Sequence, residues 1–147
     1  KKFDFKIHII GKGYLSEKIK DYEKSYPKII KFYGYVKNPF DRFKHLIDLF
    51  CITSRYDGTP NVLGEAMSLG IPCLAPKKVG LSSFMLKNSQ FGYLYDPEKK
   101  NNFKSKVIQI EKEYLLAKKK AKKGFYSMKR FNKKNTLNKL KDAIYSI

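Results

Sequence analysis

The sequence has few or none of the features that mark secreted, membrane-spanning and disulfide-rich proteins. Its 147 residues include only two cysteines, Cys51 and Cys73, and no Cys-x-x-Cys pair. A disulfide framework is therefore excluded, and a reducing compartment is expected. The apolar runs are only a few residues long, as at residues 49–52, against the ~20 residues that a membrane-spanning helix needs. No N-terminal segment resembles a signal peptide. We expect a soluble, cytoplasmic protein of one domain spanning residues 1–147.

Several catalytic signatures are also missing. Neither Gly-x-x-x-x-Gly-Lys-Ser/Thr nor Gly-x-Ser-x-Gly occurs, which argues against P-loop NTPases and α/β-hydrolases. No Asp-x-Asp occurs, and His8 and His45 are far apart without clustered cysteines or acids, so we expect no metal and no cofactor. Gly11 and Gly13 form a Gly-x-Gly pair, but Ser16 stands where a dinucleotide fingerprint has its third glycine.

Acidic residues are scarce, and the excess of positive charge is uneven along the chain. Lys and Arg number 32 against 13 acids, for a net charge of +19, and residues 98–147 alone hold 16 bases and 4 acids. Only three of the bases are arginines, whereas base readout and bidentate phosphate contacts favour arginine. Nucleic acid is thus an unfavoured partner. The alternatives are a solvated lysine face that reflects an AT-rich coding sequence, and contact of the lysine-rich tail with an anionic membrane surface.

Short apolar segments and amphipathic segments alternate about every 20 residues up to residue 96. This alternation predicts an α/β fold, with a Rossmann-like parallel sheet and helices on both faces. The expected strands are 5–10, 29–32, 49–53, 71–75 and 92–95, and the expected helices are 16–25, 39–47, 61–69 and 82–87. Ser16 is the expected N-cap of its helix. Residues 101–147 form a basic helical tail, interrupted near Gly124 and Asn132.

The segment 54–67, SRYDGTPNVLGEAM, predicts an anion site where a helix follows a strand. Thr59 is a suitable N-cap, and Pro60 suits the first helical position. The backbone N–H groups near Asn61 and Val62 would then be unpaired at the positive end of the helix dipole. Such a terminus at the carboxyl edge of a parallel sheet is well suited to a diphosphate.

Two carboxylates flank this predicted anion site. Asp57 precedes the helix, and Glu65 lies four residues after Asn61 on the same helix face. Carboxylates beside a phosphate make sense if they accept hydrogen bonds from hydroxyls, Glu65 from a ribose diol and Asp57 from a second polyhydroxylated group. The implied ligand is a nucleotide sugar. The simpler alternative is that Asp-Gly-Thr-Pro forms a turn and Glu65 complements the helix dipole.

These residues also carry a family resemblance. The segment SRYDGTPNVLGEAMSLGIPCLAP resembles the donor-binding signature of family 4 retaining glycosyltransferases of the GT-B fold. FKIHIIGKG and IIKFYGYVKNPF are similar to two further strand–loop units of that family, so the resemblance covers residues 5–96. It implies the C-terminal, donor-binding half of a GT-B enzyme that transfers a hexose from a nucleotide diphosphate sugar to a glycan or lipid-linked acceptor. The resemblance also implies that the reaction retains the anomeric configuration and needs no metal. It further implies a role in bacterial surface polysaccharide synthesis.

The resemblance also assigns roles to individual residues. Asp57 would contact the donor sugar and Glu65 the ribose hydroxyls. The remaining donor-binding positions lie in the loops and at the helix start, and they are Gly11, Gly13, Gly34, Tyr35, Val36, Gly58, Asn61, Val62 and Leu63. Of these, the amides at 61–63 would bind the diphosphate, the loop at 34–36 would lie against the nucleobase, and Gly11 and Gly13 would line the cleft.

Two departures from the family pattern bear on activity. The first acid of the motif is usually Glu, and Asp57 is one methylene shorter. The family's diphosphate-binding Arg and Lys, and its acceptor-binding N-terminal domain, lie upstream of residue 1, so we expect a fragment that is inactive alone. Its partners would be the nucleotide sugar and that N-terminal domain, with a peripheral position at the inner membrane face as a further option. The alternative function is a basic, non-enzymatic module that binds nucleic acid or an anionic membrane.

Overall fold

The structure is a computed structural model that describes residues 5–54, 58–131 and 141–142. The chain divides into two compact units, unit 1 (residues 1–43) and unit 2 (residues 44–147). The expectation of a single domain over residues 1–147 stays a prediction.

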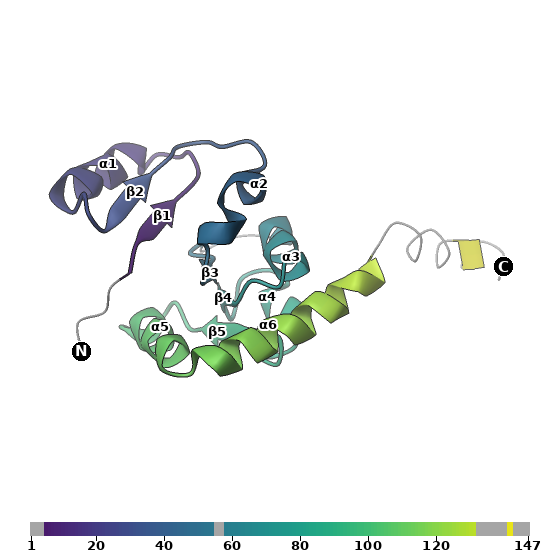
Figure 1. The fold of residues 1–147 in the computed structure, drawn as a ribbon. Helices are drawn as coiled ribbons and strands as arrows, with labels where there is room; N and C mark the ends of the chain where they lie inside the picture. Colours follow the sequence, from purple (N-terminus) through teal and green to yellow (C-terminus); the bar gives the residue numbers. More distant parts are fainter. Residues whose placement is uncertain (1–4, 55–57, 132–140, 143–147) are drawn as a thin grey trace. The chain divides into compact units, whose positions relative to one another are not determined.

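Unit 1 is a small parallel β–α–β arrangement (Figure 1). Strand β1 (Ile7–Ile9) and strand β2 (Ile30–Phe32) pair in parallel, with Ile7 opposite Ile30 and Ile9 opposite Phe32. Helix α1 (Ser16–Ser25) forms the crossover between them and packs against β2. A short helix, α2 (Pro39–Phe43), follows and buries Phe40 and Phe43. The β-branched residues favour the strands, and the Gly-x-Gly turn separates β1 from α1.

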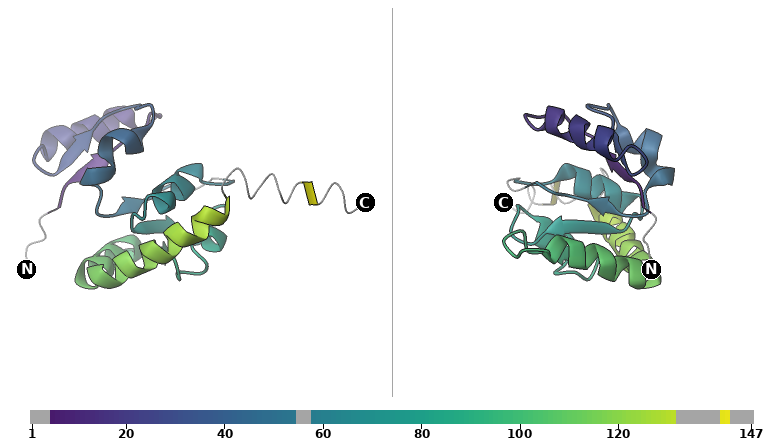
Figure 2. Two further views of the ribbon diagram at one scale, coloured as in Figure 1. Left: turned by 45° about the vertical axis from the view of Figure 1, so that its right-hand side comes forward. Right: turned by 90° about the vertical axis from the view of Figure 1, so that its left-hand side faces the viewer.

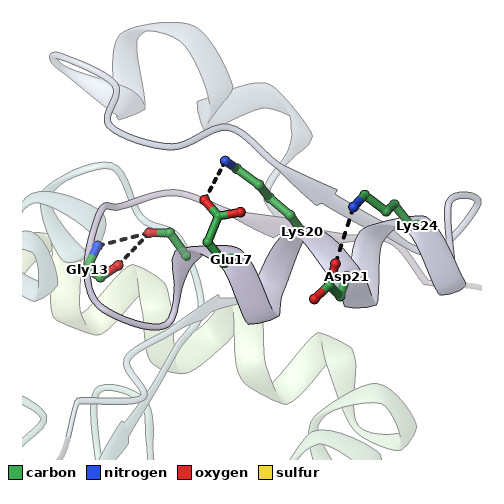
Figure 3. Close-up of polar contacts among 6 residues, drawn as sticks. Gly13, Glu17, Lys20, Asp21 and Lys24 are labelled. Carbon is green, nitrogen blue, oxygen red and sulfur yellow. Dashed lines mark hydrogen bonds and ion pairs between the residues drawn. The ribbon is translucent and has the colours of Figure 1, made fainter.

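The start of α1 differs from the prediction. Ser16 is the first helical residue and not the N-cap, which is Leu15, and no side chain caps this helix end. The Ser16 hydroxyl instead donates to the Gly13 carbonyl at 2.7 Å and accepts from the Gly13 N–H at 3.1 Å (Figure 3). Because the hydroxyl is used in closing the Gly13 turn, it does not reach a first-turn amide. Along the exposed face of α1, Lys20 pairs with Glu17 and Lys24 with Asp21 (Figure 3).

Unit 2 contains a three-stranded parallel sheet in the order β3–β4–β5. Its strands are β3 (Phe50–Cys51), β4 (Cys73–Pro76) and β5 (Tyr93–Tyr95). Phe50 lies opposite Cys73, and Leu74 opposite Tyr93. The other elements are the 3-10 turns η1 (Lys44–Leu46) and η2 (Lys129–Phe131) and the helices α3 (Asn61–Ser68), α4 (Ser82–Met85), α5 (Asn102–Lys112) and α6 (Tyr114–Met128).

The core of unit 2 lies around the central strand β4. All four residues of β4 are buried, and since successive side chains of a strand point to opposite faces, both faces of the sheet are covered. Helices α3 and α4 pack against β4 and α5 against β5, while α6 packs against α3 and α5. Figure 2 shows α5 and α6 running along one side of the sheet. The predicted α/β class, with parallel strands, flanking helices and C-terminal helices, is confirmed.

Gly124 does not interrupt the last described helix, contrary to the prediction. Helix α6 runs through it to Met128. The residue is buried where α6 packs closely on its neighbours: a Cβ added there would lie 3.3 Å from the carbonyl oxygen of Phe91 and 3.4 Å from the Cε of Met67. The glycine therefore allows close packing and does not end the helix. The other predicted interruption, at Asn132, lies outside the described residues.

The two cysteines occupy neighbouring strands. Cys51 ends β3 and Cys73 begins β4, and both are free thiols. Burial raises the pKa of the Cys51 thiol to about 12 and that of Cys73 further. Both thiols therefore stay protonated at neutral pH and act as small apolar core groups.

Among the helices within the described ranges, none has the length and apolarity to cross a bilayer.

Candidate functional site

The predicted anion site lies at the beginning of α3, after the carboxyl end of β3. The helix begins at Asn61, the first residue of the range expected for it, and Pro60 occupies the capping position, with φ −73° and ψ 87°. Thr59 makes no capping bond, because no side chain caps this helix end. The prediction that Thr59 caps the helix and Pro60 is its first residue is therefore wrong. The ψ of Pro60 is not helical, and its carbonyl accepts a tight turn bond from Leu63 N–H at 2.8 Å.

This helix end exposes two amides at a positive dipole end. As the first two helical residues, Asn61 and Val62 have no acceptor for their N–H groups inside the helix, and both residues are exposed. No acidic side chain lies in the first turn to offset the dipole. Leu63 differs, because it is fully buried and its N–H already donates to Pro60. The terminus can therefore offer an anion the amides of Asn61 and Val62.

Of the two predicted carboxylates, Glu65 lies among the residues that the structure describes. Glu65 is exposed on α3, one turn beyond Asn61, and among residues in the described ranges none forms an ion pair with it. An unpaired carboxylate beside exposed amides can accept hydrogen bonds from ligand hydroxyls. Asp57, the predicted sugar contact, lies outside the described residues, so its role stays a prediction.

The loop between β4 and α4, residues 77–81, is tied to the same edge of the sheet. Leu81 N–H donates to the carbonyl of Gly58 at 3.1 Å, which holds this loop beside the segment leading into α3. Lys77 N–H donates to Tyr95 at 2.7 Å and extends the sheet beyond β4. Lys78 pairs with Glu98 at 2.9 Å, whereas no carboxylate of the described chain pairs with the exposed Lys77. Lys77 is a cation at this edge that the sequence reasoning missed, although its place directly after a strand was a usable signal.

Ser82 stands at the start of α4 with a buried hydroxyl. Its side chain is fully buried, and its Oγ has no hydrogen-bond partner among the residues described. The next residue, Ser83, donates its hydroxyl to the carbonyl of Lys77 and so stabilises the loop. Ser83 thus serves in the turn, whereas the N-cap position of α4 belongs to Leu81.

In unit 1 the structure brings two of the predicted glycines together. Gly11 N–H donates to the carbonyl of Gly34 at 2.8 Å, which joins the loops that follow β1 and β2. Both residues have positive φ, +141° and +63°, a conformation that side chains with a Cβ rarely adopt. Tyr35 is 75% exposed directly after this bond, and Val36 is half-buried. A flat, exposed ring beside a rigid glycine loop can stack on a planar ligand.

Beside this loop lies an aromatic cluster that the sequence reasoning did not predict. His8 Nδ1 lies 2.9 Å from the hydroxyl of Tyr33, and the two rings stack at 5.7 Å. Tyr33 also packs on Phe43 at 4.6 Å, and the guanidinium of Arg42 lies 5.1 Å from the Phe43 ring centre. These residues are far apart in sequence, so only the position of Tyr33 directly before Gly34 gave a signal.

The predicted site residues thus fall into two groups, one in each unit. Unit 1 holds Gly11, Gly13, Gly34, Tyr35 and Val36, and unit 2 holds Gly58, Asn61, Val62, Leu63 and Glu65. Over residues 5–54, 58–131 and 141–142, the structure shows no group of three or more His, Cys, Asp or Glu side chains arranged to hold a metal ion.

Comparison with known proteins identifies a family and relatives with similar sequences. The family profile described as Glycosyl transferases group 1 matches residues 1–113. The lipopolysaccharide 1,6-galactosyltransferase of Escherichia coli is 31% identical over 101 residues, which cover 65% of this chain and 28% of that protein. The corresponding enzyme of Salmonella typhimurium is 32% identical over 120 residues, or 76% of this chain and 33% of that protein. The chain thus spans about a third of the length of these relatives.

Solved structures agree on the fold. The chain is similar to the apo lipopolysaccharide outer core galactosyltransferase WaaB, with a TM-score of 0.73 and 24% identity over 96% of this chain and 40% of that one. It is also similar to Anabaena HepE in complex with UDP, with a TM-score of 0.80 and 16% identity over 97% of this chain and 41% of that one. The fold is therefore that of one half of a GT-B glycosyltransferase. Because the family profile matches more than half of its residues, the chain belongs to the group 1 glycosyl transferases.

Proposed function

We propose that this chain is the donor-binding part of a glycosyltransferase that takes a hexose from a nucleotide diphosphate sugar during bacterial surface polysaccharide synthesis. The observation that carries the proposal is the uncapped, exposed start of α3, with the unpaired Glu65 one turn further along the same helix. Membership of the group 1 family and the likeness to lipopolysaccharide galactosyltransferases support the reaction class. The fold is shared with Anabaena HepE, which has been crystallised with UDP and with UDP-glucose.

The proposed donor contacts follow from the chemistry of each group. The amides of Asn61 and Val62 bind the diphosphate and stabilise the charge that develops on it as the sugar leaves. Glu65 accepts hydrogen bonds from the ribose diol. Tyr35 and the Gly34 loop lie against the nucleobase, and Asp57 contacts the transferred sugar. The exposed Lys77, held at the same edge of the sheet, adds positive charge near the diphosphate.

The finer features of the reaction are proposed on the same basis. The acid-x7-acid spacing of Asp57 and Glu65 supports membership of family 4, whose members retain the anomeric configuration. Because amide dipoles and lysine can stabilise the leaving diphosphate, we propose that the reaction needs no divalent metal. We assign donor binding to this chain, and acceptor binding to the rest of a longer enzyme.

Titration calorimetry of the chain with UDP and GDP tests the proposal. We expect saturable binding with a preference for one nucleoside diphosphate, and binding that is unchanged by EDTA. Glu65→Gln removes the charged acceptor, and hydrogen bonds to charged groups contribute about 1.5–3 kcal/mol, so affinity should fall at least about 10-fold. The matched control is Glu111→Gln, which changes an exposed acid on α5 in the same unit and should leave affinity unchanged.

Two results would contradict the proposal. One is equal affinity of the parent and the Glu65→Gln variant for the preferred nucleotide. The other is the absence of nucleotide binding together with oligonucleotide binding that falls steeply with salt, which is the behaviour of a basic binding module.

A further inference from the structure

Helix α6 has two faces of different character. Its buried face is lined by the small residues Ala117, Ala121 and Gly124, which pack toward the interior of unit 2. Successive residues of a helix are about 100° apart, so a residue two positions away lies on the opposite side. By that geometry, Leu115, Lys119, Lys122 and Tyr126 form a stripe directly opposite the buried residues. We call these four residues the outward stripe.

The outward stripe combines apolar and cationic side chains that are all exposed. Leu115 is 78% exposed and Tyr126 is 56% exposed, and Leu116 flanks them at 44%. Lys119 and Lys122 are exposed between them, and in the described chain neither meets a carboxylate. With 78% of its surface exposed, Leu115 contributes little to the packing of unit 2. Its placement among lysines indicates a surface that meets something both apolar and anionic.

The charge of the surrounding segment is of one sign. Residues 114–131 contain seven basic side chains and no Asp or Glu. Two of the other three lysines of α6 lie over aromatic rings of this unit: Lys120 over Tyr93 at 4.1 Å and Lys118 over Tyr114 at 5.2 Å. Lys119 and Lys122 have no such ring contact in the described structure, so their charges are available to a partner.

We propose that the outward stripe of α6 docks the protein on an anionic lipid surface. The lysines would pair with lipid headgroups while Leu115 and Tyr126 enter the interfacial layer, where tyrosine is favoured and lysine stems lie along apolar surface. A nucleic-acid surface fits less well, because it offers nothing to the exposed leucines and because Arg130 is the only arginine in this segment. The contact is peripheral and independent of donor binding.

Vesicle co-sedimentation of the full chain tests the charge component. We expect binding to phosphatidylcholine vesicles that contain phosphatidylglycerol, no binding to phosphatidylcholine alone, and release by salt. Each lysine near an anionic surface changes affinity about 5-fold, so Lys119→Ser with Lys122→Ser should weaken binding about 25-fold. The control, Lys18→Ser with Lys28→Ser, removes the same charge from exposed positions in unit 1 and should weaken binding less than about 3-fold.

Tryptophan fluorescence tests the apolar component. The chain contains no tryptophan, so Tyr126→Trp introduces a single reporter. Its emission should shift to the blue on addition of the anionic vesicles. Tyr22→Trp, at a position that is 50% exposed on α1, is the matched control and should show no shift. Circular dichroism and UDP binding of all variants should match the parent, since every changed side chain is exposed.

Any of three results would overturn the proposal. The first is equal binding of the parent and the Lys119/Lys122 double variant to anionic vesicles. The second is an unchanged emission of the Tyr126→Trp variant with vesicle-bound protein. The third is displacement of the chain from the vesicles by a duplex oligonucleotide, which would assign the outward stripe to nucleic acid.

Discussion

Gly92 is the position at which the structure makes its sharpest stability prediction. It directly precedes β5, opposite Cys73 of β4, and it is buried. A Cβ added there would lie 2.8 Å from the carbonyl oxygen of Cys73 and 2.8 Å from Cδ2 of Leu86. Gly92 does not have a positive φ, so the cost of Gly92→Ala is steric and not conformational. The carbonyl of Cys73 belongs to the central strand and cannot move without disturbing the sheet.

The magnitude follows from two opposing terms. Overpacking of a well-packed core costs about 1–3 kcal/mol, whereas replacing glycine restricts the unfolded chain and returns about 0.4–1 kcal/mol. The net loss is about 1–2 kcal/mol, which lowers the melting temperature of a protein of this size by about 3–6 °C. Melting followed by far-ultraviolet circular dichroism measures it.

Gly64→Ala is the matched control within α3. Its Cβ would lie 3.3 Å from the Cε atoms of Met85 and Met128, which are the far ends of flexible side chains and can turn away. Alanine in a helix interior gains up to about 1 kcal/mol over glycine, so this variant should melt at the parent's temperature or slightly above it. A Gly92→Ala variant that melts no lower than the parent would refute the steric reasoning.

Two further predictions concern titratable groups of unit 2. Burial, with a hydrogen bond to Glu113 at 3.0 Å, raises the pKa of Tyr93 to about 12. Since an unfolded tyrosine has a pKa of about 10, the folded state is fully stabilised below that pH and loses stability as the pH rises from about 10 to 12. Tyr93→Phe should reduce this alkaline loss of stability, measured by urea titrations. At neutral pH the variant should have a free energy of unfolding lower by about 1 kcal/mol, because the hydrogen bond to Glu113 is missing. An equally steep alkaline loss in the variant would contradict the assignment of this loss to Tyr93. Burial raises the pKa of the Cys51 thiol to about 12 and that of Cys73 further. Both thiols should therefore react with a disulfide reagent only as unit 2 unfolds. Rapid reaction of the folded chain would contradict the burial of Cys51 and Cys73 in β3 and β4.

The order and type of the elements could be predicted from the sequence because they depend on local patterns. Helix α1 ends at Ser25 as predicted and begins at Ser16, the residue predicted to cap it, and each predicted strand contains or overlaps the observed one. The start of α3 was predicted to within one residue, since proline and the following amphipathic pattern mark a helix start wherever they occur. The candidate site at this helix start was therefore a consequence of local sequence.

Tertiary packing decided which groups are available for binding at that site. Packing of the unit buries Leu63 fully, the loop at Leu81 is tied to Gly58, and Gly11 N–H donates to Gly34 across the loops that follow two strands. It also decided that Gly124 lies inside a helix, because the backbone of Phe91 approaches it closely. Periodicity and turn chemistry act over a few residues and can be read along the chain. Hydrogen bonds and close contacts between distant segments depend on how the helices and strands pack, and that becomes visible only in three dimensions.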